Sequence, residues 1–305
     1  MKPAPFSFVR PQGLQHALEA LAADPGAKVL AGGQSLVPLL SMRLAAPSTL
    51  VDINALPDLD HVRVDDSGVR VGALARQADV LGSDDVRRVQ PLLSLALSQV
   101  AHATIRNRGT VVGSLVHADA AAELPMVLTL LGGSVSVASA TGTRTIPAAE
   151  LYAGPLESTL HHDEIAVEAL FPGLGPGEGV AFEEVSRRHG DYALCGVAAV
   201  VRVEGAHVAE ARVGYMSVAD VPTVVDLTTA LVEEVAQRPS RRARNQGELS
   251  DQAVSAAAEL ALQHLDPADD LHASSAYRAQ LVRVLTAHAL RAAHDDAVVR
   301  GGAPG

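Results

Sequence analysis

The first third of the chain alternates between segments typical of helices and short apolar segments typical of strands. Residues 14–23 (LQHALEALAA) repeat apolar residues at helical spacing, and an Asp-Pro-Gly turn follows them. Strands are predicted over 28–31 and 49–53, with one or two helical turns over 36–44 between them. Because strands that alternate with helices form parallel sheets, this order predicts a small parallel α/β unit.

The pattern changes in the middle of the chain. Valines on alternate positions over 62–73 predict strands, residues 92–100 predict a helix, and residues 132–146 predict a second strand pair around a Thr-Gly turn. These segments add α+β character to the α/β start.

A domain boundary is predicted at residues 171–179 (FPGLGPGEG), where two prolines and four glycines favour neither helix nor strand. Paired strands over 197–203 and 208–215 follow, and then helices near 225–236, 251–265 and 275–299. We therefore predict a first domain over 1–175, divided at about residue 58, a second domain over 176–300, and a flexible tail over 301–305.

Composition limits the possible partners. Lys and Arg total 24 against 35 Asp and Glu, and the one basic segment, 238–244, is predicted to be a solvated loop, so no nucleic acid partner is expected. The longest apolar run, 193–201, is far shorter than the roughly 18 residues that span a bilayer, so no direct membrane insertion is expected. The single cysteine, Cys195, excludes a disulfide within the chain and a self-contained iron–sulfur site, and predicts a cytoplasmic protein.

Two glycine-containing segments are candidates for ligand binding. Residues 28–36 (KVLAGGQSL) run from a strand through two glycines into a helix start, where backbone amides can approach a phosphate. Taken alone, this segment is equally consistent with a tight turn that binds nothing. Residues 108–115 (RGTVVGSL) offer further amides and two hydroxyls. Together the two segments predict two walls around one pyrophosphate, which a Rossmann fold holds with a single loop.

Other polar residues give weaker signals. Residues 161–164 (HHDE) are predicted to form a solvated turn rather than a metal site, because adjacent strand residues face opposite sides. Tyr192 is either a core residue or a ring against a flat ligand, and the sequence slightly favours the core. No nucleophile or carboxylate pair stands out, so we predict neither a catalytic residue nor a metal site in this chain.

Three long segments carry a family resemblance: residues 28–59, residues 104–131 (TIRNRGTVVGSLVHADAAAELPMVLTLL) and residues 187–201 (RRHGDYALCGVAAVV). They resemble the FAD-binding medium subunit of molybdenum hydroxylases, of the carbon monoxide dehydrogenase type, which is similar to the flavin domain of xanthine dehydrogenase. The resemblance covers nearly the whole chain. It implies an α+β fold with a two-part FAD-binding domain of the vanillyl-alcohol-oxidase type, in which a small parallel α/β unit precedes a larger mixed and antiparallel α+β unit. A smaller C-terminal domain of antiparallel strands and helices would follow.

The resemblance also implies which residues contact FAD. One side of the pyrophosphate would be held by Lys28, Val29, Leu30, Ala31, Gly32, Gly33, Gln34, Ser35 and Leu36, and the other side by Gly109, Thr110, Gly113 and Ser114. The remaining contacts would lie along the flavin, its ribityl chain and the isoalloxazine ring: Ala101, Ile105, His117, Ala118, Glu123, Ile165 and Tyr192.

The function implied is that of an oxidoreductase subunit that transfers electrons. A small subunit with two 2Fe-2S clusters and a large subunit with the molybdenum cofactor would be its partners, in a dimer of heterotrimers. The chain would pass electrons through FAD to an external acceptor, and any membrane contact would go through the complex. Two alternatives remain open: a stand-alone FAD oxidase or dehydrogenase of the same superfamily, and an assembly protein whose loops are only turns.

One departure from the family pattern concerns Val112, which stands where relatives have the first of two adjacent glycines. A β-branched residue resists positive φ at a cost of about 1–2 kcal/mol. We therefore predict that Val112 is extended; the alternative is an altered phosphate loop with weaker affinity for the flavin.

Overall fold

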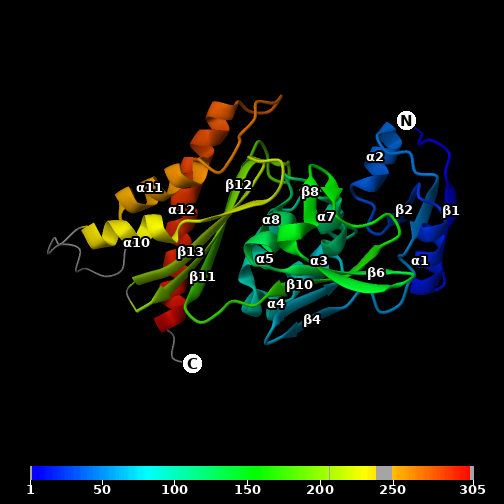
Figure 1. Ribbon diagram of the computed structural model, residues 1–305, viewed down its shortest axis with the longest axis horizontal. Helices are drawn as coiled ribbons and strands as arrows, with labels where there is room; N and C mark the ends of the chain where they lie inside the picture. The colour runs from blue at the N-terminus through cyan, green and yellow to red at the C-terminus, as the bar shows by residue number, and fades with distance from the viewer. Residues whose placement is uncertain (1, 206, 238–248, 303–305) are drawn as a thin grey trace. The chain divides into compact units, whose positions relative to one another are not determined.

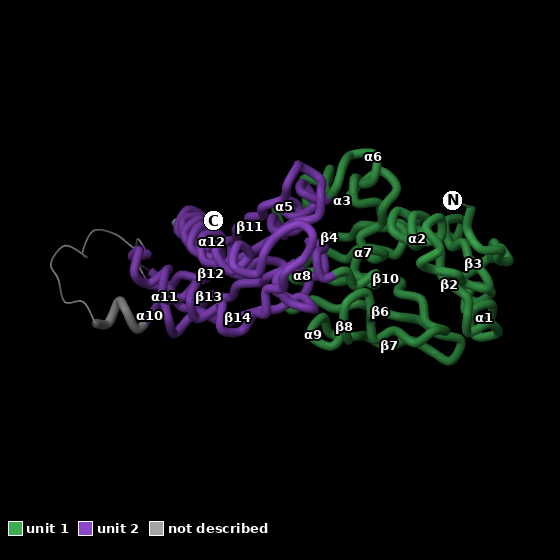
Figure 2. The backbone as a smooth tube through the Cα atoms, turned by 90° about the horizontal axis from the view of Figure 1, so that it is seen from above, with its two compact units in different colours: residues 1–89, 101–119, 132–172 green, residues 90–100, 120–131, 173–305 purple. Residues whose placement is uncertain are grey.

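The computed structural model describes residues 2–205, 207–237 and 249–302. The chain forms two compact units, each assembled from separate stretches of sequence (Figure 2). Unit 1 comprises Met1–Val89, Ala101–Asp119 and Gly132–Pro172, and unit 2 comprises the remaining segments. The predicted basic loop at 238–244 lies outside the described residues.

Unit 1 begins with the parallel sheet that the alternating pattern predicts. Its strands are β1 (Ser7–Val9), β2 (Ala27–Leu30) and β3 (Thr49–Asp52), in the order β1-β3-β2, and both pairs are parallel. Helix α1 (Leu14–Ala23) buries its apolar face against this sheet, and α2 (Leu36–Met42) follows β2. Since all three strands run the same way, their carboxyl ends meet at one edge.

The second part of unit 1 is an antiparallel sheet of order β4-β5-β10-β6-β7. Its strands are β4 (Val62–Asp65), β5 (Gly68–Gly72), β6 (Ser134–Ser139), β7 (Gly142–Pro147) and β10 (Ile165–Pro172). The unit also contains five short helices and a small hairpin: α3 (Gln77–Gly82), α4 (Asp84–Val89), α6 (Ala103–Arg106), α7 (Val111–His117), α9 (Ala148–Leu151), β8 (Tyr152–Gly154) and β9 (Glu157–Ser158).

Unit 2 is an antiparallel sheet with helices on both faces. Strands β11 (Glu178–Ser186), β12 (Ala193–Glu204), β13 (His207–Met216) and β14 (Thr223–Asp226) follow one another in space as in sequence. Helices α10 (Thr228–Gln237), α11 (Asp251–Leu262) and α12 (Ser275–Gly302) come last, and α12 runs along the sheet (Figure 1). Val213 and Tyr215 of β13 join the core that α11 and α12 cover, whereas Gly214 between them faces Met126.

The structure corrects several predictions about organisation. Helices α5 (Pro91–Gln99) and α8 (Glu123–Leu130), which fall in the predicted first domain, belong to unit 2, because their apolar surfaces pack on its sheet. The predicted linker is shorter, since Phe171 pairs with Val69 in β10 and Glu178 already pairs with Arg202 in β11.

Two element boundaries near the C-terminus also differ. Residues 225–226 belong to strand β14 rather than to a helix, because they pair with β13. Gly301 and Gly302 end α12 instead of starting a tail, and 303–305 lie outside the described residues. Within the described ranges, no helix is long and apolar enough to cross a membrane.

Candidate cofactor-binding site

The two glycine segments lie against each other in unit 1. Gly32, just after β2, is so close to the second segment that a Cβ at this position would lie 2.4 Å from the carbonyl oxygen of Arg108 and 2.9 Å from Cα of Gly109. Only a hydrogen atom fits there. The structure therefore brings the two predicted walls into backbone contact.

A cavity of about 490 Å³ opens beside this contact, at the carboxyl ends of the three parallel strands. Ligands of open α/β sheets bind at this edge, because the loops that follow the strands converge there. The lining residues end or follow the three strands, or contact the second glycine loop: Arg10, Leu30, Ala31, Gly32, Gly33, Gln34, Val37, Asp52, Asn54, Arg76 and Arg108.

The cavity is rich in hydrogen-bond donors and positive charge. Among the described residues, no protein acceptor pairs with the amide N–H groups of residues 32–36, and Gly33 takes a left-handed φ of 72° that other residues resist. Arg76 and Arg108 have no carboxylate within ion-pair distance in the described ranges. Burial, together with the nearby Arg108 charge, lowers the pKa of Arg76. Such a donor set suits an anion.

Not all of the predicted first wall faces the cavity. Residues 30–34 line it, whereas Lys28 and Val29 lie further back in β2, and Ser35 and Leu36 form the start of α2. The Ser35 side chain makes no capping hydrogen bond, so its hydroxyl stays available.

The second wall is the beginning of a helix. Thr110 caps α7, where its Oγ1 accepts a hydrogen bond from the Gly113 amide at 3.1 Å, and Ser114 lies in the first turn. Val112 is also helical and 2% exposed, so the prediction that it is extended was wrong. Its φ is not positive, and a valine is unstrained there.

Replacing Val112 by glycine is expected to destabilise unit 1 by about 2 kcal/mol without increasing FAD affinity. The change removes a buried side chain and places glycine inside a helix. Val116→Gly in the same helix, where the side chain is only partly buried, is the matched control and is expected to cost less. Thermal unfolding and FAD titration measure both effects, and a clear gain in affinity for Val112→Gly would contradict the helical account.

The other predicted contact residues are spread over both units. Ala101, Ile105, His117, Ala118 and Ile165 lie in unit 1, and Glu123 and Tyr192 lie in unit 2. Ala101 and Ala118 have φ values of 42° and 55°, a strained conformation for alanine that is concentrated at functional sites. Burial lowers the pKa of His117, against the influence of Asp119. Because the Tyr192 side chain is 66% exposed, the preference for a core role was wrong.

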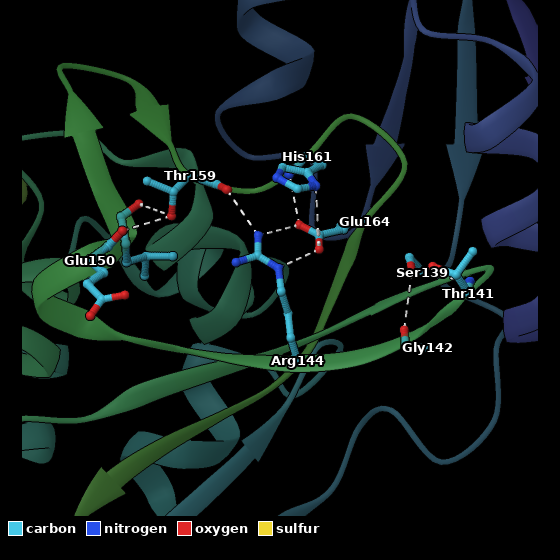
Figure 3. Close-up of polar contacts among 9 residues, drawn as sticks. Ser139, Thr141, Gly142, Arg144, Glu150, Thr159, His161 and Glu164 are labelled. Carbon is cyan, nitrogen blue, oxygen red and sulfur yellow. Dashed lines mark hydrogen bonds and ion pairs between the residues drawn. The ribbon is translucent and has the colours of Figure 1, made fainter.

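The HHDE segment forms a turn anchored by its glutamate (Figure 3). Arg144 on β7 donates from Nε to Oε1 of Glu164 at 2.7 Å and from Nη2 to Oε2 at 2.8 Å, and the His161 amide donates to Oε2 at 2.8 Å. The described residues contain no group of three potential metal ligands. Glu164 thus fixes the start of β10, directly before Ile165.

The Glu164 carboxylate is expected to make stability pH-dependent. The hydrogen bond from Arg144 holds the pKa of Glu164 below its ordinary value of 4.5. The contribution is therefore complete above pH 4.5 and is lost as the pH falls through the lower, folded-state pKa. Glu164→Gln should cost about 1–3 kcal/mol at pH 7, and its difference from the wild type should shrink in acid. Glu157→Gln, at an exposed position, should show neither effect in thermal unfolding.

Fold and site together define a class of protein, an FAD-binding oxidoreductase chain of the two-part α+β type. Residues 4–174 match the family model described as the FAD binding domain in molybdopterin dehydrogenase, and residues 180–293 match the CO dehydrogenase flavoprotein C-terminal domain. The chain belongs to the family of FAD-binding medium subunits of molybdenum hydroxylases, as the resemblance implied.

Similar proteins extend over almost the whole chain. The 6-hydroxypseudooxynicotine dehydrogenase complex subunit alpha of Paenarthrobacter nicotinovorans is 42% identical over 95% of each chain. The carbon monoxide dehydrogenase medium chain of Hydrogenophaga pseudoflava is 32% identical over 96% of this chain and 98% of the relative.

Solved structures show the same fold. Carbon monoxide dehydrogenase from Hydrogenophaga pseudoflava superposes with a TM-score of 0.86 at 31% identity, covering 97% of this chain and 99% of that one. Quinoline 2-oxidoreductase from Pseudomonas putida 86 reaches 0.87 at 33% identity, with the same coverage. The predicted fold class is confirmed.

Sequence reasoning missed five residues that line the cavity: Arg10, Val37, Asp52, Asn54 and Arg76. Asp52 lies at the end of a predicted strand of a parallel sheet and Asn54 directly follows that strand, so the rule that ligands bind at carboxyl ends could have found both. Arg76 carries no comparable signal, because it lies between a strand and a short helix of the other sheet.

Proposed function

We propose that this chain is the electron-transfer subunit of a molybdenum hydroxylase complex. The observation that carries the proposal is the backbone contact between the two glycine loops, beside a cavity lined by Arg76 and Arg108, which have no carboxylate within ion-pair distance in the described ranges. The donor set fits FAD, because amide and guanidinium groups both bind a pyrophosphate: the loop at Gly32 and Gly33 exposes amides, and Arg76 and Arg108 bring guanidinium groups to the same cavity. When bound, FAD supplies the redox chemistry, accepting electrons from the clusters of a partner and releasing them to an external acceptor.

The residues of this chain would hold and orient the cofactor. The pyrophosphate would be bound by the loop over 28–36 and by the start of α7, with Gly109, Thr110, Gly113 and Ser114. The predicted contacts with the rest of the cofactor are Ala101, Ile105, His117, Ala118, Glu123, Ile165 and Tyr192. The 66% exposure of Tyr192 is compatible with this role.

The partners that we infer are a small subunit with 2Fe-2S clusters and a large subunit with the molybdenum cofactor, in a dimer of heterotrimers. Relatives named as a complex subunit and a medium chain support this arrangement. The cysteine count supports it too, because a 2Fe-2S cluster is usually ligated by four thiolates and this chain has one. The single cysteine, Cys195, is buried, and burial raises the pKa of its thiol to about 12.

The test compares the chain alone with the complex. The purified chain should take up FAD and show an oxidised-flavin spectrum, but organic substrates should not reduce it. Co-expressed with the two partner subunits, it should be reduced by the substrate of the complex, and removal of FAD should stop electron delivery to a dye while the clusters are still reduced. Flavin reduction in the isolated chain would instead establish a stand-alone oxidase, and failure to bind FAD would favour an assembly protein.

A further inference from the structure

The side chain of Asn54 ties the first glycine loop to the sheet. Its Nδ2 donates to the carbonyl oxygen of Ala31 at 2.8 Å and to Oδ1 of Asp52 at 2.7 Å. Its Oδ1 accepts a hydrogen bond from Nη2 of Arg76 at 2.9 Å. Both the nitrogen and the oxygen of the Asn54 amide group therefore form hydrogen bonds, which fix the orientation of the side chain.

Arg76 continues this connection to the second loop. Its Nη1 donates to the carbonyl oxygen of Arg108 at 2.8 Å, the same oxygen that excludes a side chain at Gly32. The backbone beside Arg76 is fixed as well, since the Gln77 amide donates to the carbonyl oxygen of Gly109 at 2.9 Å. Arg76 thus holds the second loop through both its side chain and its neighbours.

Hydrogen bonds that run from Ala31 through Asn54 and Arg76 to Arg108 therefore connect the two glycine loops. Charge pairing does not explain the arginine, because within the described ranges no carboxylate lies within ion-pair distance of it. What the position requires is a planar group whose two nitrogens reach two oxygens in different directions, which lysine cannot provide.

We propose that Asn54 and Arg76 form a bracket that sets the spacing of the two glycine loops and so positions FAD. The inference rests on the proposed function and adds to it two positioning residues outside the glycine loops. Without either residue, the two glycine loops could move apart. Their amide groups would then no longer converge on one ligand.

The experiment is an FAD titration of the full-length chain, freed of flavin, with fluorescence quenching as readout. Arg76→Lys keeps the charge but loses one arm of the bracket, and it should weaken binding about tenfold, as should Arg76→Gln and Asn54→Ala. The double variant Asn54→Ala/Arg76→Lys should bind FAD about as tightly as each single variant, because either change alone already opens the bracket. The visible circular dichroism of bound FAD should change in all four.

Arg70→Lys is the matched control, since Arg70 pairs with Glu168 at 3.2 Å on the antiparallel sheet and should leave the affinity unchanged. Wild-type affinity in Arg76→Lys would show that the charge alone acts and would overturn the bracket, as would additive losses in the double variant. If the wild-type chain binds FAD and the variants bind equally well, only the bracket fails. If the wild-type chain binds none, the proposed function fails, and the bracket with it.

Discussion

Replacing Gly32 by alanine is expected to weaken FAD binding by about a hundredfold. The added Cβ would lie 2.4 Å from the carbonyl oxygen of Arg108, and backbone cannot move aside as a flexible side chain can. The two glycine loops would have to separate, which displaces the amides that we propose hold the pyrophosphate. The φ of Gly32 is not in the left-handed region, so the effect tests close approach alone.

Gly13→Ala and Gly82→Ala are the controls, because a Cβ at either position meets no atom within 4 Å. Both should bind FAD as the wild type does. Thermal unfolding of the flavin-free proteins separates loss of the site from loss of the fold. Full affinity in Gly32→Ala would show that the loops need not touch for binding.

Replacing Arg278 by alanine is expected to destabilise unit 2 by about 3 kcal/mol. Arg278, at the start of α12, is 6% exposed. Its Nη1 donates to the carbonyl oxygens of Leu194 and Ser217, both at 2.7 Å, and its Nη2 donates to Oδ2 of Asp270 at 2.6 Å. Truncation leaves two carbonyl groups without their Arg278 donor. The free-energy cost of this loss exceeds that of losing the ion pair with Asp270, because the Asp270 carboxylate is partly exposed to water.

A drop of roughly 6–12 °C in the melting temperature would correspond to this loss. The matched control is Arg283→Ala on the same helix, where the guanidinium forms a surface pair with Glu259 at 2.6 Å. Exposed pairs contribute at most about 1 kcal/mol, so this variant should melt close to the wild type. Equal effects in the two variants would mean that the buried carbonyls do not depend on Arg278.

Local patterns account for the elements that were predicted correctly. The helix over 14–23 and the strands around residues 28–31 and 49–53 follow from apolar spacing and turn residues, which act within a few positions of the chain. One error came from a local capping signal that was overlooked, and another arose where long-range strand pairing decides. Val112 is helical because Thr110 caps a helix there, and Phe171 is in a strand because Val69 supplies its partner.

The sequence by itself determined that a parallel α/β unit and two glycine loops exist, because spacing and glycine content act on the local backbone. Only the tertiary structure decided that Gly32 touches Arg108 and that Asn54 and Arg76 join the loops. The physical reason is that the two ends of this connection, at Ala31 and Arg108, accept through backbone carbonyl oxygens, which every residue carries. No residue type in the sequence marks such an acceptor, and only folding brings donor and acceptor within reach.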